Sequence, residues 1–290
     1  MTNLPMHKPF LYFGTPYVAS DTLALLMERG FVPSAVITSP DAPRGRGLAS
    51  APSETRTWAE NHGLTVLAPE KLDAAFIETL EGYGAEYAIV VAYGKILPQA
   101  LIDALPLGIL NIHYSLLPKY RGASPVEAAL LNDDAVTGVT VQQMAFALDS
   151  GDILATSEVA IEPEETTREL RRRLIALGAD LLASLLPSFE QGAITPVPQD
   201  ASAATFCGRI LKSEGELTLA GDAQANWNKY RAFAESPGTF FFGEHKGKRI
   251  RVKIRTANFE NGAFMPDRIV PEGKKETGYA DLLSHGFVPL

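Results

Sequence analysis

The sequence predicts an α/β fold, a doubly wound and mostly parallel sheet, followed by a smaller β-rich domain. Over the first 160 residues, short and continuously apolar runs alternate with helix-like stretches. This pattern is typical of parallel strands that are covered by helices on both faces. Near the C-terminus the strand signals are short and separated by Gly and Pro, which favours a separate small β domain. A chain of 290 residues is long enough for two domains of unequal size.

Apolar periodicity and helix-breaking residues predict the individual elements. We expect strands at residues 9–13, 34–38, 64–67, 87–91, 108–112, 137–144 and 153–161. We expect helices at residues 18–29, 53–62, 71–81 and 166–190, and a Pro- and Gly-rich loop at residues 39–47. The predicted domain organisation is a first domain at residues 1–191, a linker at residues 192–204 and a second domain at residues 205–290.

Composition excludes several classes of protein. An apolar fraction of 46% argues against wholesale disorder. The single cysteine, Cys207, excludes an intramolecular disulfide and a Cys-based zinc site. We find no apolar run long enough to span a membrane and no signal-peptide core at the N-terminus. We therefore expect a cytoplasmic, monomeric protein that does not bind membranes.

The net charge of −8 is unevenly divided along the chain. Residues 201–290 carry 13 Lys and Arg against 10 Asp and Glu, whereas residues 1–200 carry the other 13 against 24. A basic second module beside an acidic body is consistent with a polyanionic partner. An unevenly charged but merely solvated surface explains the same numbers.

Asn111 and His113 are the first candidate site. They lie two residues apart at the end of a predicted strand, so both side chains point to the same face. In a doubly wound sheet this strand end is where ligands bind. An amide donor beside an imidazole suits an oxyanion that forms on an attacked carbonyl. The alternative is a capping Asn and an ordinary packed His.

Asp149 is the second candidate, in the segment Leu148-Asp149-Ser150-Gly151-Asp152 between two predicted strands. A carboxylate there can orient an imidazole or hold a water molecule. The same residues also make a good turn, and the spacing alone does not separate the two interpretations.

The second module contains a strictly alternating basic stretch. As a strand, residues 249–255 would put Ile250, Val252 and Ile254 on one face and the basic residues Arg249, Arg251, Lys253 and Arg255 on the other. Like charges along one face repel each other unless they meet a polyanion. The alternative is a basic edge strand that discourages aggregation.

These motifs together resemble a known family. Asn111-x-His113-x-Ser115-Leu116-Leu117-Pro118, followed by Leu148-Asp149-x-Gly151-Asp152, is similar to the signature of the folate-dependent formyltransferases. Further matches follow in the family's order at residues 13–16, 40–47, 91–98, 121–125 and 138–144, with weaker ones at residues 210–215 and 271–275. Any one motif is weak, but the ordered series is specific.

The resemblance implies an enzyme and a substrate. Members of the family transfer a formyl group from 10-formyltetrahydrofolate to an amine, and the chain is most similar to those that act on methionyl initiator tRNA. By analogy, Asn111 and His113 would donate to the formyl oxygen, while Asp149 would keep His113 protonated and help to remove the amine's proton. No metal takes part. The second domain would be a small barrel of the oligonucleotide-binding type.

The resemblance also implies binding residues. The folate would lie against residues from two segments, Ala92, Tyr93, Gly94, Lys95, Ile96 and Leu97 together with Ser115, Leu116, Leu117 and Pro118. The tRNA would contact five basic residues, Arg44 and Arg46 in the first domain and Arg249, Arg251 and Lys253 in the second. Two alternatives remain, a formyltransferase for an amino sugar nucleotide and a catalytically idle RNA-binding relative.

The chain departs from the family at three places. Ala42 stands where the family usually has a basic residue, and the second domain is shortened between residues 261 and 268. Tyr114 stands beside the predicted catalytic histidine where a small residue is common. We expect its ring to narrow the site or to stack on substrate.

Overall fold

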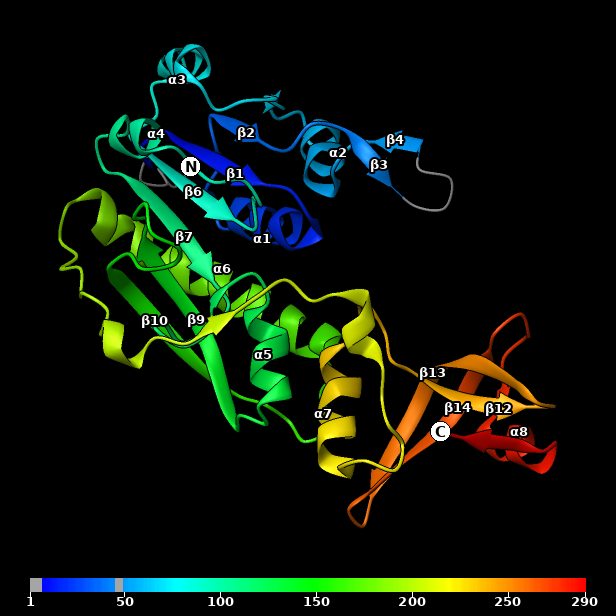
Figure 1. Ribbon diagram of the computed structural model, residues 1–290. Coiled ribbons are helices and arrows are strands. Elements are labelled where there is room, and N and C mark those ends of the chain that lie inside the picture. The colour runs from blue at the N-terminus through cyan, green and yellow to red at the C-terminus, as the bar shows by residue number, and fades with distance from the viewer. Residues whose placement is uncertain (1–6, 45–48) are drawn as a thin grey trace. The chain divides into compact units, whose positions relative to one another are not determined.

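The computed structural model describes residues 7–44 and 49–290, and Figure 1 shows its elements. The chain divides into two compact units. The first comprises Met1–Arg121, Gly138–Val159 and Arg173–Phe206. The second comprises Gly122–Thr137, Ala160–Arg172 and Cys207–Leu290. Each unit is therefore assembled from segments that are distant in the sequence.

The first unit is built on a seven-stranded sheet with the order β10-β9-β7-β6-β1-β2-β5. The strands are β1 (Phe10–Gly14), β2 (Ala35–Ile37), β5 (Val66–Leu67), β6 (Tyr87–Val91), β7 (Ile109–His113), β9 (Val136–Gln143) and β10 (Ile153–Ala160). The strands from β7 to β5 pair in parallel, and β9 joins β7 in the antiparallel sense. The predicted doubly wound, mostly parallel sheet is confirmed.

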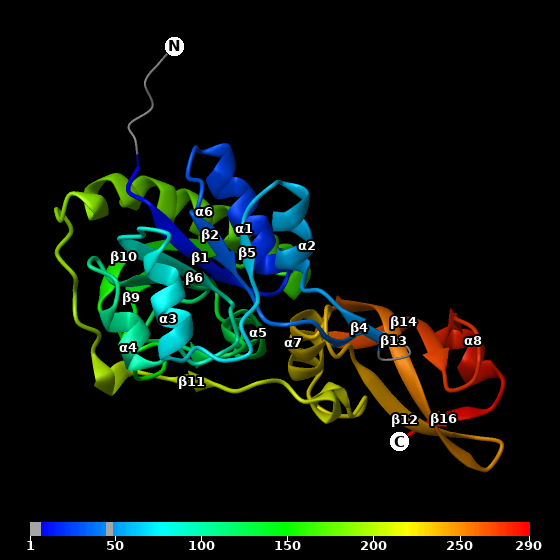
Figure 2. The same ribbon diagram turned by 90° about the horizontal axis from the view of Figure 1, so that it is seen from above.

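Helices cover both faces of this sheet (Figure 2). They are α1 (Tyr17–Glu28), α2 (Glu54–Asn61), α3 (Ala74–Glu81), α4 (Gln99–Asp103) and α6 (Thr167–Glu190). Leu80 of α3 and Leu101 of α4 pack on the face formed by Leu11, Val90 and Ile109. The helices α1 and α6 lie on the opposite face. None of the helices in the described ranges is long and apolar enough to cross a membrane.

Two short pairs of strands differ from the expectation. Residues 39–47 were expected to form a loop, but Ala42–Arg44 (β3) and Ala49–Ala51 (β4) pair as antiparallel strands. Arg121–Gly122 (β8) and Phe206–Cys207 (β11) form a second small ladder. Both pairs are only two or three residues long, and strands of that length leave little periodicity in the sequence.

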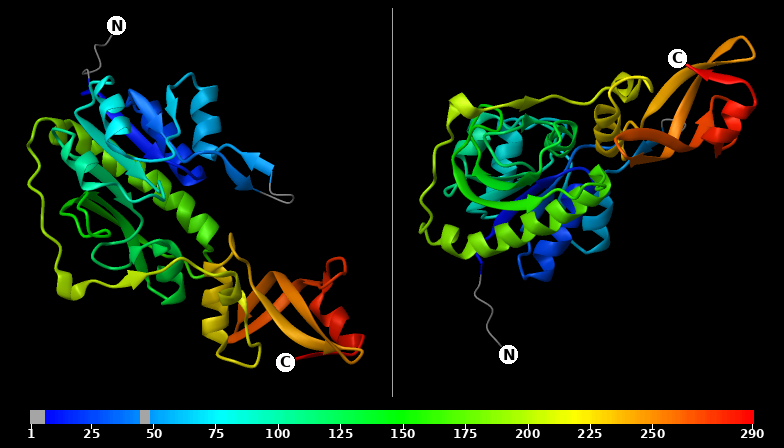
Figure 3. Two further views of the ribbon diagram at one scale, coloured as in Figure 1. Left: turned by 45° about the horizontal axis from the view of Figure 1, so that its top comes forward. Right: turned by 90° about the horizontal axis from the view of Figure 1, so that it is seen from below.

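The second unit contains a curled antiparallel sheet with the order β15-β14-β13-β12-β16 (Figure 3). Its strands are β12 (Phe240–His245), β13 (Lys248–Glu260), β14 (Ala263–Pro271), β15 (Thr277–Gly278) and β16 (Phe287–Pro289). The unit also holds three helices that the sequence analysis did not anticipate, α5 (Pro125–Leu131), α7 (Ala223–Ala232) and α8 (Tyr279–Ser284). The sheet is a half-barrel, consistent with the predicted oligonucleotide-binding type.

The alternation predicted for residues 249–255 is confirmed. Val252 and Ile254 are buried and pack against Trp227 of α7. The basic residues between them are intermediate or exposed. The inner face of β13 thus contributes to the core of the second unit, because burial of its apolar side chains outweighs the repulsion among the charges opposite.

The shortened stretch between residues 261 and 268 corresponds to a tight hairpin. β13 and β14 are joined by Asn261 and Gly262, with φ values of 51° and 75°, between the paired residues Glu260 and Ala263. Two consecutive positive φ values are what a two-residue hairpin turn requires, and Asn-Gly is the preferred pair. The shortening therefore leaves β13 and β14 directly connected.

Replacement of Gly262 by alanine tests this turn. An alanine held at positive φ costs about 1–2 kcal/mol, so we expect Gly262→Ala to lower the free energy of unfolding of the full chain by about that amount in a urea titration. Gly208→Ala is the matched control, because a Cβ at Gly208 meets no atom within 4 Å and its φ is not positive. Equal losses in the two variants would contradict the turn assignment.

Candidate active site

Asn111 and His113 lie at the carboxyl end of β7. Both side chains are buried, with exposed fractions of 9% and 6%, and they share the face of Ile109, which packs against the α3 side of the sheet. Alternation along β7 therefore places them as predicted. Strand pairing fixes their backbone, because β7 pairs with β6 on one side and with β9 on the other.

Tyr114 points away from this site. Its hydroxyl lies 3.1 Å from the hydroxyl of Thr22 in α1, and the side chain is only 8% exposed. The expectation that its ring narrows the site or stacks on substrate is therefore wrong. The alternation that brings His113 to one face sends the next residue to the other.

Two oxygen atoms flank the imidazole of His113. Its Nε2 lies 2.8 Å from the carbonyl oxygen of Tyr120. Its Nδ1 lies 3.7 Å from Oδ2 of Asp149. A neutral imidazole carries one N–H, whereas the protonated ring carries two and can donate on both sides. Both ring nitrogens of His113 therefore face an oxygen acceptor.

A second set of contacts fixes the Asp149 carboxylate. Its Oδ1 accepts from Nδ2 of Asn111 at 3.4 Å and from Nε2 of Gln142 at 3.1 Å. Asp149 has a φ of 44°, and the loop passes so close to β9 that a Cβ on Gly151 would lie 1.7 Å from the carbonyl oxygen of Gln143. The segment therefore forms a turn and also directs its carboxylate toward Asn111 and His113.

The structure adds two groups that the sequence analysis missed. Gln142 pairs with Asn111 across β9 and β7, and its side chain is 1% exposed. Tyr120 contributes only its carbonyl oxygen, from a backbone with a φ of 58°. The register between two strands supplies the first contact and the path of a loop supplies the second. No pattern in the sequence would have revealed either.

Residues predicted to contact folate form the loop after β6, and several of them alternate between exposed and buried. Ala92, Gly94 and Ile96 are exposed, and Ile96 reaches 84%. Tyr93 and Leu97 are buried, with exposed fractions of 2% and 3%, and Lys95 is half-buried. Burial raises the pKa of Tyr93 to about 12, so its phenol stays neutral. The loop can therefore offer backbone groups and one apolar side chain to a flat ligand.

Other predicted folate contacts also serve the loops themselves. Lys95 donates from Nζ to the carbonyl oxygen of Pro69 at 2.8 Å. Ser115 is fully buried and donates to the carbonyl oxygen of Lys119 at 2.6 Å. Leu117 is also buried, while Leu116 and Pro118 are half-buried. The buried members of this segment can thus shape a pocket wall but expose little side chain to a ligand.

The basic strand of the second unit carries aromatic rings beneath its charges. The guanidinium of Arg249 lies 4.3 Å from the ring centre of Phe242, and that of Arg251 lies 3.6 Å from the ring centre of Phe240. Lys253 is exposed next along the strand. Stacked guanidinium groups keep their charge while the rings fix their positions.

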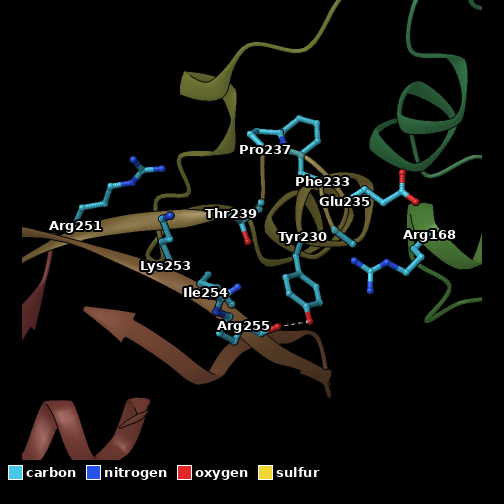
Figure 4. A pocket seen from close by; sticks show the side chains of 12 residues that line it. Arg168, Tyr230, Phe233, Glu235, Pro237, Thr239, Arg251, Lys253, Ile254 and Arg255 are labelled. Carbon is cyan, nitrogen blue, oxygen red and sulfur yellow. Dashed lines mark hydrogen bonds between the residues drawn. The ribbon is translucent and has the colours of Figure 1, made fainter. Parts of the chain in front are cut away.

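A pocket of about 280 Å³ extends this basic surface (Figure 4). Basic side chains line it, Arg168, Arg251, Lys253 and Arg255, and Glu235 is its single acidic residue. Thr239 also lines it, and the Thr239 hydroxyl oxygen is buried without a hydrogen-bond partner. A pocket with this balance of charge and an unused hydroxyl suits a phosphate group.

Two predicted tRNA contacts remain, Arg44 and Arg46. The backbone of Arg44 ends β3, and Arg46 lies outside the described residues. Within the part of the chain that the structure describes, no group of three or more His, Cys, Asp and Glu residues could hold a metal ion.

Comparison with known proteins identifies the family. The model of the formyl transferase family matches residues 10–190. A methionyl-tRNA formyltransferase of Methylobacterium sp. (strain 4-46) is 40% identical over 270 residues, which is 92% of this chain and 86% of the relative. A methionyl-tRNA formyltransferase of Thermus thermophilus is 39% identical over 264 residues, 90% of this chain and 85% of the relative.

Solved structures share the fold. The N-formyltransferase of Helicobacter canadensis, in complex with folinic acid and dTDP-3-aminofucose, has a TM-score of 0.63 at 19% identity, covering 87% of this chain and 89% of that one. HypX of Aquifex aeolicus with tetrahydrofolic acid has a TM-score of 0.64 at 15% identity, covering 96% and 47%. The matched model and the extent of similarity to the two relatives show that this chain belongs to the formyl transferase family.

Proposed function

We propose that the protein transfers the formyl group of 10-formyltetrahydrofolate to the α-amine of methionine on initiator tRNA. The observation that carries this proposal is the convergence of Asn111, His113 and Asp149 at one strand end. The similarity to methionyl-tRNA formyltransferases over about 90% of the chain supports the choice of substrate. The reaction belongs to the initiation of translation in the cytoplasm.

The three side chains suit attack of an amine on a formyl carbon. The amine nitrogen forms a bond to the carbon, and the carbonyl oxygen becomes an oxyanion that the Asn111 amide and the His113 ring can stabilise. The bond from that carbon to the folate nitrogen then breaks, the oxyanion returns to a carbonyl, and the leaving nitrogen takes up a proton. Asp149, through water, accepts the proton that the attacking amine loses. An amine is nucleophilic when neutral, so no Ser or Cys nucleophile is needed.

Folate binding is assigned to the exposed side of the loop at residues 92–97 and to the wall at residues 115–118. Support comes from the alternation of buried and exposed residues after β6 and from its position at the carboxyl end of a parallel sheet, where ligands of such folds bind. The side chain of Ile96 offers an apolar contact to the ring.

The tRNA is assigned to the second domain and to the β3–β4 hairpin. We keep the division into a catalytic domain at residues 1–191, a linker at residues 192–204 and an RNA-binding domain at residues 205–290. The stacked Arg249 and Arg251 and the exposed Lys253 support the assignment of the tRNA to the second domain. Such charges contact phosphates and position the RNA without reading its bases.

The catalytic assignment predicts a large loss of turnover in two variants. His113→Ala and Asp149→Ala should each lower kcat at least about 10²–10³-fold, while folate affinity changes little. Loss of an oxyanion donor at His113 has that effect, and so does loss of a general base at Asp149. We suggest measuring formyl-methionine formation and, separately, folate binding by fluorescence. His62→Ala is the control, because His62 is exposed on the far end of α2. Near-normal kcat in either variant would refute the assignment.

The choice of acceptor is tested with the unsubstituted protein. We expect formylation of charged initiator tRNA and none of an amino sugar nucleotide when each is incubated with 10-formyltetrahydrofolate. Formylation of the sugar alone would favour the sugar formyltransferase alternative. Tight RNA binding without any formyl transfer would favour the idle relative.

The basic strand predicts the salt dependence of RNA binding. Replacing Arg249, Arg251 and Lys253 by Gln should flatten the plot of log affinity against log salt by about 2–3 units, since each phosphate contact contributes roughly 0.7–0.9. Arg268→Gln is the control, because Arg268 lies on β14 and pairs with Glu276. An unchanged slope in the triple variant would place the RNA elsewhere.

A further inference from the structure

One short segment forms hydrogen bonds to both residues that supply the oxygen atoms flanking His113, Tyr120 and Asp149. Residues 199–205 follow α6 and lead to β11, and Figure 2 shows them in the yellow-green stretch that ends at β11. The carbonyl of Tyr120 lies on one side of the imidazole and the Asp149 carboxylate on the other. The segment forms hydrogen bonds to the chain on each of these sides.

Gln199 holds the Asp149 side. Its Nε2 donates to the carbonyl oxygen of Asp149 at 2.9 Å and to that of Gly151 at 2.7 Å. The same nitrogen lies 3.4 Å from Oε1 of Gln142, the residue whose Nε2 donates to the Asp149 carboxylate. The Gln199 amide thus fixes the loop that carries Asp149 and the side chain that orients it.

Gln199 and Thr205 hold the Tyr120 side. Oε1 of Gln199 accepts from Nε and from one terminal nitrogen of Arg121, at 3.1 and 2.7 Å. Oγ1 of Thr205 accepts from the backbone N–H of Tyr120 at 2.9 Å. The carbonyl oxygen of Thr205 accepts from the backbone N–H of Arg121, also at 2.9 Å. Two backbone nitrogens, those of Tyr120 and Arg121, are therefore bonded to the segment, and the Arg121 side chain adds two more contacts.

The segment itself is anchored just before Gln199. Val197 and Ile153 exchange two backbone hydrogen bonds of 2.8 Å. This bridge fixes the register of the segment against β10, and Gln199 is thereby held opposite the loop that carries Asp149. A connection without structure of its own would not be held at one fixed position along β10.

We infer that residues 199–205 are part of the catalytic machinery, with Gln199 and Thr205 as positioning residues that hold the two acceptors on either side of His113. The inference rests on the proposed formyl transfer. Because the same segment continues along the chain into residues 207–290, the connection to the RNA-binding module also serves as the outer support of the active site.

The chemistry of the Gln199 position requires a neutral amide. Both donor bonds go to carbonyl oxygens and the acceptor bonds come from a guanidinium. A glutamate would retain the contact with Arg121 but would place a second carboxylate against two carbonyl oxygens and close to Asp149. An alanine would remove all of these contacts.

The test compares four variants of the full-length protein in the formylation assay. Gln199→Ala and Gln199→Glu should each lower kcat about 10²-fold, the effect expected of a misplacement near 1 Å, and should leave KM for both substrates within about twofold. Thr205→Val, which is isosteric but lacks the acceptor for Tyr120, should lower kcat less. Gln191→Ala is the matched control, since Gln191 is exposed in the turn after α6, and should behave as the unsubstituted protein.

A second readout does not depend on activity. In protein labelled with ¹⁵N in its histidines, the His113 ring signals, assigned from the spectrum of His113→Ala, should shift in Gln199→Ala and stay unchanged in Gln191→Ala. Unchanged His113 signals together with kcat within about threefold in Gln199→Ala would overturn the inference. Failure of the proposed function would give a different result, because the unsubstituted protein itself would then form no formyl-methionine.

Discussion

The imidazole of His113, held between two oxygen acceptors, is the constraint on which the rest of the site depends. A ring with a carbonyl at one nitrogen and a carboxylate near the other is held in one orientation. Both acceptors come from loops with positive φ values, at Tyr120 and Asp149. Strained loops keep such conformations only where the surroundings hold them, which is why buried amides of Gln142 and Asn111 gather around the carboxylate.

The sheet contributes rigidity and the loops contribute chemistry. β7 is bonded on both sides, so Asn111 and His113 are fixed within a core in which most side chains are fully buried. The opposite face of the same strand end is closed by the contact of Tyr114 with α1. The second unit is organised differently: burial of Val252 and Ile254 holds a strand whose other face is free to present stacked cations.

Much of this could be predicted from the sequence because the signals are local. Continuous apolar runs such as residues 87–91, between helical segments, are typical of strands buried on both faces. The alternation at residues 249–255, in a strand, places charged and apolar side chains on opposite faces. The sequence analysis missed the paired strands β3 and β4 and the helix α7 at residues 223–232. The first is too short to show periodicity, and the second has only a narrow apolar stripe around Trp227.

The sequence by itself determined the sheet, the shared face of Asn111 and His113, and the basic face of β13, since each follows from the spacing of neighbouring residues. Only the tertiary structure decided which groups surround His113. Tyr120, Gln142, Asp149 and Gln199 come from four separate segments, and strand register, loop path and the anchoring of Val197 on Ile153 bring them together. Contacts between residues that are distant along the chain leave no periodic pattern in the sequence. The sequence therefore named the candidate catalytic side chains but not the groups that support them.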